Sequence, residues 1–220
     1  MKKNVYVSVS TDPISSYQEI VEYARFMQNH ADFLHCDVMD GKFVEKMTYD
    51  YALVKNINAN SLIPLDVHLM VSEPFEDIKK YIKASANILT IHFEAFEDKQ
   101  KIVESIDLIK KEGALAGISL KPETSFKDIK PYCFGVDLIL VMSVEPGASG
   151  QKFLKNTYKK IKDIDDFRKE NGLNFKIEVD GGVTKDNAKL LTDLGADILV
   201  SGSFVYKAQD REKAVKDLRG

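Results

Sequence analysis

Short apolar segments alternate with longer segments of helical periodicity along the whole chain. The short segments are rich in β-branched residues, and they predict strands at about Val5–Ser10, Phe33–Val38, Leu65–Met70, Ile88–His92, Ala116–Leu120, Leu138–Val141, Phe175–Val179 and Ile198–Val200. In the longer segments, apolar residues recur at intervals of three and four, as in Tyr17–Gln28, Ile102–Lys111 and Tyr158–Lys169. Because strands that alternate with helices pair in parallel, the pattern predicts an α/β fold with a parallel sheet.

The number of repeats decides between two parallel architectures. Eight strand–helix units within 220 residues are typical of a single (β/α)8 TIM barrel. An open, doubly wound sheet normally carries a glycine-rich turn after its first strand, and the segment Ser8–Asp12 contains no glycine. No linker or low-complexity tract interrupts the chain, so we expect residues 1–220 to form one barrel domain.

Two segments carry start signals for helices. Ser72 and Pro74 are expected to open the helix that follows the third strand. Thr184, which precedes Lys185, is expected to cap the helix that follows the seventh strand.

Composition and charge narrow the classes of partner. Lys and Arg number 31 against 34 Asp and Glu, so the net charge is −3 and no basic excess favours nucleic acid. Only two cysteines occur, Cys36 and Cys133, which is too few for a disulfide framework. No apolar run approaches the roughly 18 residues of a membrane-spanning helix, and no signal-peptide core follows Met1. We therefore expect a cytoplasmic protein without a nucleic-acid or membrane partner.

Candidate metal ligands gather at the carboxyl ends of the predicted strands, where TIM barrels hold their active sites. Side chains alternate along a strand, so His35 and Asp37 share one side of the second strand. His68 ends the third strand and Asp180 ends the seventh. Two imidazoles and two carboxylates at one rim suit a divalent transition metal, so we expect one ion of zinc, manganese or iron.

Small residues follow the sixth, seventh and eighth strands and indicate a phosphate site. Backbone N–H groups can approach an anion closely in such loops, and barrels often hold phosphate after their last two strands. The candidate residues are Gly147, Ser149, Gly150, Gly181, Gly182, Gly202 and Ser203.

Four segments together resemble a known family. They are His35–Gly41 (HCDVMDG), Asp66–Val71 (DVHLMV), Val141–Gly147 (VMSVEPG) and Glu178–Val183 (EVDGGV). In order and spacing they are similar to the motifs of the ribulose-phosphate 3-epimerase family, which includes an allulose-6-phosphate 3-epimerase branch.

The resemblance implies a barrel of the ribulose-phosphate-binding type and an isomerase of the pentose phosphate pathway. It implies that a ketose phosphate, D-ribulose 5-phosphate, is inverted at C3 through an enediolate to D-xylulose 5-phosphate. It also implies that Asp37 and Asp180 act as the acid/base pair and that a metal is held by them with His35 and His68. A metal at the C2 and C3 oxygens stabilises such an intermediate, and inversion needs one proton-transfer group on each face.

The resemblance also implies substrate contacts. The family has a ring of methionines near the substrate, which Met39, Met70 and Met142 match. His68 is expected to contact the substrate as well. Ser8 matches a serine that contacts substrate, with Ser10 as its alternative.

Departures from the family pattern bear on the substrate. The usual Asn-Pro-Gly-Phe-Gly-Gly-Gln loop begins here with Glu145 and has Ala148 in place of phenylalanine, and Glu45 replaces a proline. An acid at the first loop position is typical of the allulose-6-phosphate branch, so D-allulose 6-phosphate is the alternative substrate.

Two other classes compete with an epimerase. A phosphate-binding barrel decarboxylase carries lysine where this chain has Met39, and Lys121 is the one candidate for an aldolase Schiff base. A non-catalytic sugar-phosphate binder is disfavoured because both acid/base carboxylates are present. The sequence does not decide which metal is bound or whether the chain forms a homo-oligomer. It also leaves two roles open for His92 and Glu94, which either support the metal ligands or are simple rim residues.

Overall fold

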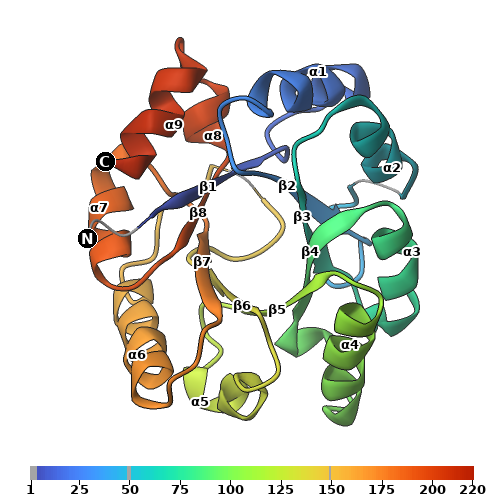
Figure 1. Ribbon diagram of the computed structural model, residues 1–220, viewed down its shortest axis with the longest axis vertical. Helices are drawn as coiled ribbons and strands as arrows, with labels where there is room; N and C mark the ends of the chain where they lie inside the picture. Colours follow the sequence, from blue (N-terminus) through green and yellow to red (C-terminus); the bar gives the residue numbers. More distant parts are fainter. Residues whose placement is uncertain (1–3, 49–50, 149) are drawn as a thin grey trace.

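The computed structural model describes residues 4–48, 51–148 and 150–220. Within these residues, eight parallel strands close into a barrel surrounded by helices (Figure 1). The strands are β1 (Tyr6–Ser10), β2 (Phe33–Met39), β3 (Leu65–Met70), β4 (Ala86–His92), β5 (Leu115–Leu120), β6 (Leu138–Met142), β7 (Lys176–Asp180) and β8 (Ile198–Ser201). The prediction of a (β/α)8 barrel is confirmed.

The helices cover the outside of the barrel. They are α1 (Tyr17–Met27), α2 (Tyr51–Asn60), α3 (Ile78–Lys83), α4 (Gln100–Lys111), α5 (Phe126–Ile129), α6 (Thr157–Glu170), α7 (Lys185–Asp193), α8 (Ser203–Tyr206) and α9 (Arg211–Arg219). Each follows a strand, with α8 and α9 both after β8. The three helical segments predicted from periodicity correspond to α1, α4 and α6, with bounds that differ by one or two residues.

Pairing between the first and last strands closes the sheet. Tyr6 to Val9 of β1 lie opposite Ile198 to Ser201 of β8, while the end of β1 also pairs with β2. Every neighbouring pair is parallel, so all strands point their carboxyl ends to the same end of the barrel. Side chains that end strands far apart in the sequence therefore meet there.

Two packed layers stabilise this arrangement. The larger one lies between the strands and the helices, and it contains residues such as Val9, Cys36 and Ile118. The smaller one lies inside the barrel and includes Leu140 and Ile198. Alternate residues of each strand belong to opposite layers, as the period of two along a strand requires.

The helix-start signals had different outcomes. Thr184 caps α7, and its side chain and that of Asn187 form a reciprocal capping box, as predicted. After β3 the prediction was wrong, because Pro74 begins a short 3₁₀ turn and α3 begins only at Ile78. The preceding Glu73 has a left-handed backbone with φ +50°, which redirects the chain before the helix can form.

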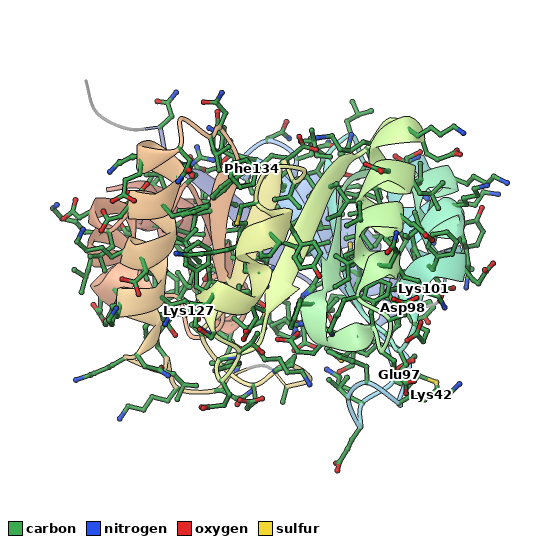
Figure 2. All side chains as sticks on the ribbon, turned by 90° about the horizontal axis from the view of Figure 1, so that it is seen from below. Lys42, Glu97, Asp98, Lys101, Lys127 and Phe134 are labelled. Carbon is green, nitrogen blue, oxygen red and sulfur yellow. The ribbon has the colours of Figure 1, made fainter. Side chains whose placement is uncertain are left out.

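The two ends of the barrel carry different residues. Lys42 and Glu97 belong to loops that follow strands, and they lie at the end opposite to Phe134 (Figure 2). Among the described residues, no helix has the length and apolar character needed to cross a membrane.

Candidate active site

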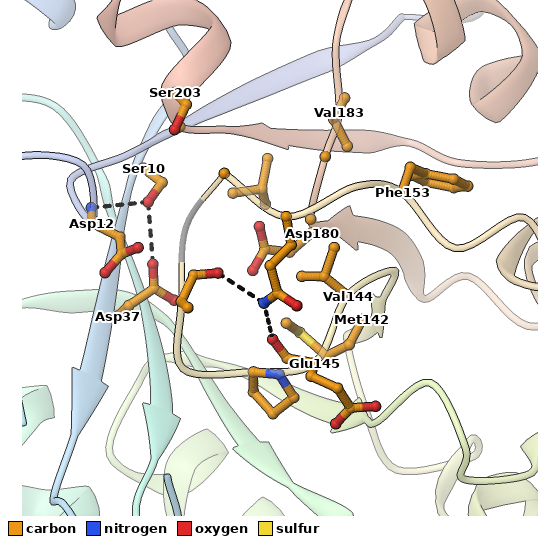
Figure 3. A pocket seen from close by; sticks show the side chains of 18 of the residues that line it. Ser10, Asp12, Asp37, Met142, Val144, Glu145, Phe153, Asp180, Val183 and Ser203 are labelled. Carbon is orange, nitrogen blue, oxygen red and sulfur yellow. Dashed lines mark hydrogen bonds between the residues drawn. The ribbon is translucent and has the colours of Figure 1, made fainter. Parts of the chain in front are cut away.

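A cavity of about 650 Å³ opens at the carboxyl ends of the strands. The carboxyl ends of β1, β2, β3, β6, β7 and β8 form part of its wall, together with the segments that follow β1, β6, β7 and β8. Ser10, Asp12 and Asp37 lie together on one side, across from Phe153 and Val183 (Figure 3). The cavity thus lies where the barrel fold leads us to expect chemistry.

The four predicted metal ligands converge beside this cavity. One nitrogen or oxygen from each of His35, Asp37, His68 and Asp180 lies within 4.8 Å of the other three. Asp37 and His68 occupy paired positions of β2 and β3, so the register sets them side by side. His35 lies two residues before Asp37 and shares its side of the strand.

Hydrogen bonds fix which histidine nitrogens face the centre of this cluster. His35 Nδ1 lies 2.6 Å from Asp66 Oδ2, which leaves Nε2 toward the cluster, 3.3 Å from Asp37 Oδ1. Among the described residues this Nε2 has no hydrogen-bond partner, although it is fully buried. His68 Nδ1 lies 3.1 Å from the same Asp37 oxygen.

The electrostatics of the cluster favour a cation. Burial opposes charge on His35, yet Asp66 and Asp37 raise its pKa well above the usual value. Burial likewise opposes ionisation of Asp37, but His35 and His68 lower its pKa. Burial lowers the pKa of His68 to about 4, so this imidazole is neutral and has a lone pair to offer. An N₂O₂ donor set with an unpartnered buried nitrogen is compatible with a divalent metal ion.

Asp37 and Asp180 differ in their preference for a proton. Burial, with Asp37 nearby, raises the pKa of Asp180 to about 7, whereas Asp37 stays ionised. The two residues come from β2 and β7, which are separated around the ring by β8 and β1. Two carboxyl groups with divergent proton affinity at one cavity suit acid and base roles.

Most of the other predicted site residues line the cavity. The cavity is lined by Met39, Met70, Met142, Gly147, Gly150, Gly181, Gly182, Gly202 and Ser203. Ser149 lies outside the described residues. His35 and His68 are fully buried and lie beside the cavity without lining it.

Ser8 does not line the cavity, whereas Ser10 does. Both side chains point into the barrel, but Ser8 lies one layer deeper and donates to Asp66 Oδ2 at 2.9 Å. Ser10 donates to Asp37 Oδ2 at 3.1 Å and accepts from the Asp12 backbone N–H. The alternation of strand residues gives both serines the same direction, so the sequence could not separate them.

Several functional candidates were missed by the sequence reasoning. Asp66 holds His35, and Glu178 lies with both of them inside the barrel. Burial and the neighbouring Asp66 raise the pKa of Glu178 well above its usual value. Asp12 lines the cavity and pairs with Lys46 of the loop after β2. Asp66 and Glu178 lie two residues before His68 and Asp180, and this spacing is the signal that could have found them.

The residues that depart from the family pattern lie at the cavity mouth. Glu45, Glu145 and Ala148 line an adjoining hollow of about 600 Å³, and the last two also border the main cavity. Glu145 and Ala148 are exposed. The departures therefore change the rim of the cavity and leave the four candidate metal ligands unchanged.

Comparison of the sequence with known proteins identifies a family. A sequence model described as "Ribulose-phosphate 3 epimerase family" matches residues 6–206. The chain is 42% identical over 191 residues to "Ribulose-phosphate 3-epimerase" of Bacillus subtilis (strain 168), which covers 86% of this chain and 87% of that one. It is 41% identical over 188 residues to the chloroplastic "Ribulose-5-phosphate-3-epimerase" of Arabidopsis thaliana, covering 86% and 66%.

Solved structures share the fold at low identity. The 3-keto-L-gulonate-6-phosphate decarboxylase of Vibrio cholerae superposes with a TM-score of 0.72 at 12% identity, covering 99% of this chain and 96% of that one. A 3-hexulose-6-phosphate synthase gives a TM-score of 0.70 at 15% identity, with coverage of 98% of each chain. At this identity the likeness concerns the barrel and not the chemistry.

Proposed function

This chain belongs to the ribulose-phosphate 3-epimerase family, and we propose that it interconverts D-ribulose 5-phosphate and D-xylulose 5-phosphate by inversion at C3. The observation that carries the proposal is the convergence of Asp37 and Asp180, from different strands, on one cavity. Inversion requires a proton to leave one face of the carbon and another to arrive on the opposite face.

We assign the metal site to His35, Asp37, His68 and Asp180. A bound divalent ion supplies positive charge that stabilises the negative charge developing on the substrate oxygens at C2 and C3. Zinc, manganese and iron all suit two imidazoles and two carboxylates. Asp66 supports this assignment because its hydrogen bond to His35 Nδ1 keeps Nε2 free.

Asp37 and Asp180 exchange protons with C3 from opposite faces in this proposal. One carboxylate removes the C3 proton while the other, protonated, delivers a different one to the planar enediolate. In the direction that starts with removal of the proton by Asp37, Asp37 is the ionised partner and Asp180 is the protonated one, in line with the higher proton affinity of Asp180. The hydrogen bond from Ser10 to Asp37 Oδ2 orients the first carboxylate.

The apolar wall keeps both carboxyl groups basic. Met39, Met70 and Met142 are each at most 3% exposed and line the cavity beside the two aspartates. An apolar environment disfavours the ionised carboxylate and so offsets the loss of basicity that a nearby cation causes. The same side chains exclude water from the enediolate.

The phosphate group occupies the opposite side of the cavity, over Gly150, Gly182, Gly202 and Ser203 in this proposal. Gly182 holds a left-handed backbone with φ +61°, and a Cβ there would lie 2.7 Å from the Phe153 backbone nitrogen. Close approach of backbone N–H groups to an anion requires such small residues. Of the two serines considered for the contact with substrate, we assign this role to Ser10, because Ser10 lines the cavity and Ser8 does not.

A coupled assay with both ketose phosphates tests the substrate. We expect turnover of D-ribulose 5-phosphate in the presence of Zn²⁺, Mn²⁺ or Fe²⁺, with D-allulose 6-phosphate as the weaker substrate. Turnover of D-allulose 6-phosphate alone would move the assignment to that branch, with Glu145 as the first residue to exchange. Turnover of neither compound with any of the three ions would refute the epimerase.

Substitution of the carboxylates tests the acid/base pair. Asp37→Asn and Asp180→Asn should each lower epimerisation by about 10²- to 10⁴-fold, because one of the two proton-transfer groups is lost. Interconversion and incorporation of solvent deuterium at C3 are measured together, with circular dichroism to confirm the fold. Asp107→Asn, on the exposed side of α4, is the matched control and should leave both rates unchanged. Undiminished exchange in both site variants would remove these residues from the mechanism.

A further inference from the structure

His92 and Glu94 form a hydrogen-bonded chain that ends on a candidate metal ligand. His92 is the last residue of β4 and is fully buried. Its Nε2 lies 2.8 Å from His68 Nε2, and its Nδ1 lies 3.0 Å from Glu94 Oε2. The rings of His68 and His92 stack with centroids 4.9 Å apart.

These contacts admit one arrangement of protons with neutral imidazoles and an ionised Glu94. The carboxylate accepts, so His92 Nδ1 must carry a proton and donate it. His92 Nε2 then has a lone pair and accepts from His68 Nε2–H. The remaining nitrogen of His68, Nδ1, is left unprotonated, and this atom faces Asp37 and the metal cluster. The chain therefore presents His68 in the tautomer that a metal ion requires.

Glu94 is itself held by three donors. Its Oε1 accepts from the Lys121 backbone N–H at 2.7 Å and from the Thr124 hydroxyl, while Oε2 faces His92. These hydrogen bonds, together with that from His92, lower the pKa of Glu94 to about 2 against the opposing effect of burial, so it is ionised. All three contacts require an acceptor, and a carboxylate provides an acceptor on each oxygen.

Phe43 closes the other side of His92. The two rings have centroids 4.8 Å apart, and Lys121 Nζ lies 4.2 Å from the centre of the Phe43 ring. The imidazole therefore lies between two rings, and its orientation is set by packing as well as by hydrogen bonds. The other candidate histidine, His35, has a simpler arrangement, with Asp66 in direct contact.

We propose that His92 and Glu94 are positioning residues that fix the tautomer of His68 and thereby strengthen metal binding. The inference rests on the proposed metal site, since it assigns a role toward that ion. It predicts that both residues affect metal affinity without contacting the metal or the sugar phosphate.

Zinc affinity, measured by competition with a chromophoric chelator, tests the proposal. His92→Phe keeps a ring between Phe43 and His68 but removes the acceptor, and it should weaken Zn²⁺ binding about 10- to 100-fold. His92→Gln restores an acceptor oxygen and should recover part of this loss. Glu97→Gln, an exposed residue of the same loop, is the matched control and should bind zinc as the unaltered protein does.

Glu94→Gln is the second test variant. Glutamine has one acceptor oxygen for contacts that occupy both carboxylate oxygens, so its NH₂ group must face either the backbone N–H of Lys121 or His92. An NH₂ group facing His92 would reverse the proton order and place a proton on His68 Nδ1. We expect zinc affinity to fall about 10-fold, and the visible spectrum of the Co²⁺-loaded protein to change.

The outcomes separate this inference from the proposed function. If the unaltered protein binds zinc tightly and both His92→Phe and Glu94→Gln bind it within twofold of that affinity, the positioning role is wrong. If the unaltered protein does not bind zinc, the metal site itself is wrong. Circular dichroism and thermal unfolding establish that each variant is folded. If His92→Phe fails to fold, the zinc affinity of Glu94→Gln by itself decides whether the positioning role is correct.

Discussion

Gly182 combines a left-handed backbone with a crowded surrounding, and the two effects can be separated by experiment. Its φ is +61°, and a Cβ would lie 2.7 Å from the Phe153 nitrogen and 3.0 Å from the Gln151 carbonyl oxygen. Gly172 has nearly the same φ, +63°, but a Cβ there would have no neighbour within 4 Å. Comparing substitutions at Gly182 and Gly172 therefore separates the cost of crowding against backbone atoms from the cost of the left-handed conformation.

Gly172→Ala should lower the free energy of unfolding by about 1 kcal/mol, the cost of a left-handed non-glycine residue. Gly182→Ala should cost more than that, because backbone atoms of the loop after β6 must move. It should also raise KM for the sugar phosphate, whereas Gly172→Ala should not. Urea unfolding and steady-state kinetics measure the two effects, and equal costs for both variants would contradict the crowding argument.

The direction of side chains was predictable from the sequence, but their depth was not. Alternation along β2 and β3 correctly placed His35, Asp37 and His68 on one side of the barrel. It could not decide between Ser8 and Ser10, which point the same way one layer apart. The depth of a residue depends on the tilt and stagger of the closed sheet, which involves strands far away in sequence.

Among the elements, α6 supports the loop that holds Glu94. Lys160 of α6 donates from Nζ to the carbonyl oxygens of Lys121, Pro122 and Thr124, at 2.9, 2.8 and 2.8 Å. Burial lowers the pKa of Lys160, with nearby acidic groups opposing the shift. The sequence assigned Lys160 only to a helix, because its partners belong to a turn some 36 to 39 positions earlier in the chain.

Lys160→Met should lower stability by about 2 kcal/mol, since three carbonyl groups lose a charged donor. It should also weaken zinc binding, because the turn that donates to Glu94 loses its support. Lys159→Met is the control, since Lys159 is exposed and pairs with Asp163 one turn away. Thermal unfolding and zinc competition test the prediction, and a Lys160 variant that matches the Lys159 variant in both would contradict it.

At the scale of the whole molecule, the end of the barrel opposite the cavity carries an ionic network. Arg168 of α6 donates to Asp165, to Asp197, and to the Phe175 carbonyl oxygen at 2.8 Å. Asp197 Oδ2 also accepts from the Ile177 backbone N–H at 2.8 Å, so the network links α6 to the beginnings of β7 and β8. Polar residues at this end of a barrel contribute to stability and not to catalysis.

The network predicts a pH-dependent stability. Burial alone would raise the pKa of Asp165, but hydrogen bonds from Lys169 and Arg168 hold it below its usual value. Such a carboxyl stabilises the fold above its unfolded pKa, near 3.9, and loses this contribution as pH falls through its folded pKa. The free energy of unfolding should therefore decline below about pH 4.

Arg168→Met should lower the free energy of unfolding by about 3 kcal/mol at pH 7, because the buried carboxylates of Asp165 and Asp197 each lose their Arg168 partner. The difference from the unaltered protein should shrink as the pH falls from 7 to 3, because protonation of Asp165 removes the charge that Arg168 stabilises. Urea unfolding at both pH values measures this, and KM should be unchanged. Lys162→Met, which removes an exposed pair with Asp166, is the control and should show no such dependence. If the loss in free energy of unfolding caused by Arg168→Met is the same at both pH values, the ion pairs of Arg168 are not its cause.

The β1–β8 pairing has a consequence for synthesis of the protein on the ribosome. β1 is made before all the other strands of the barrel, yet one of its two neighbours, β8, begins only at Ile198. Until that strand is made, one edge of β1 has backbone groups without their final partners, and the nascent sheet can pair wrongly with other chains. The candidate ligands of β2 and β3 are made well before Asp180 of β7, so the complete cluster forms only after β7 has left the ribosome.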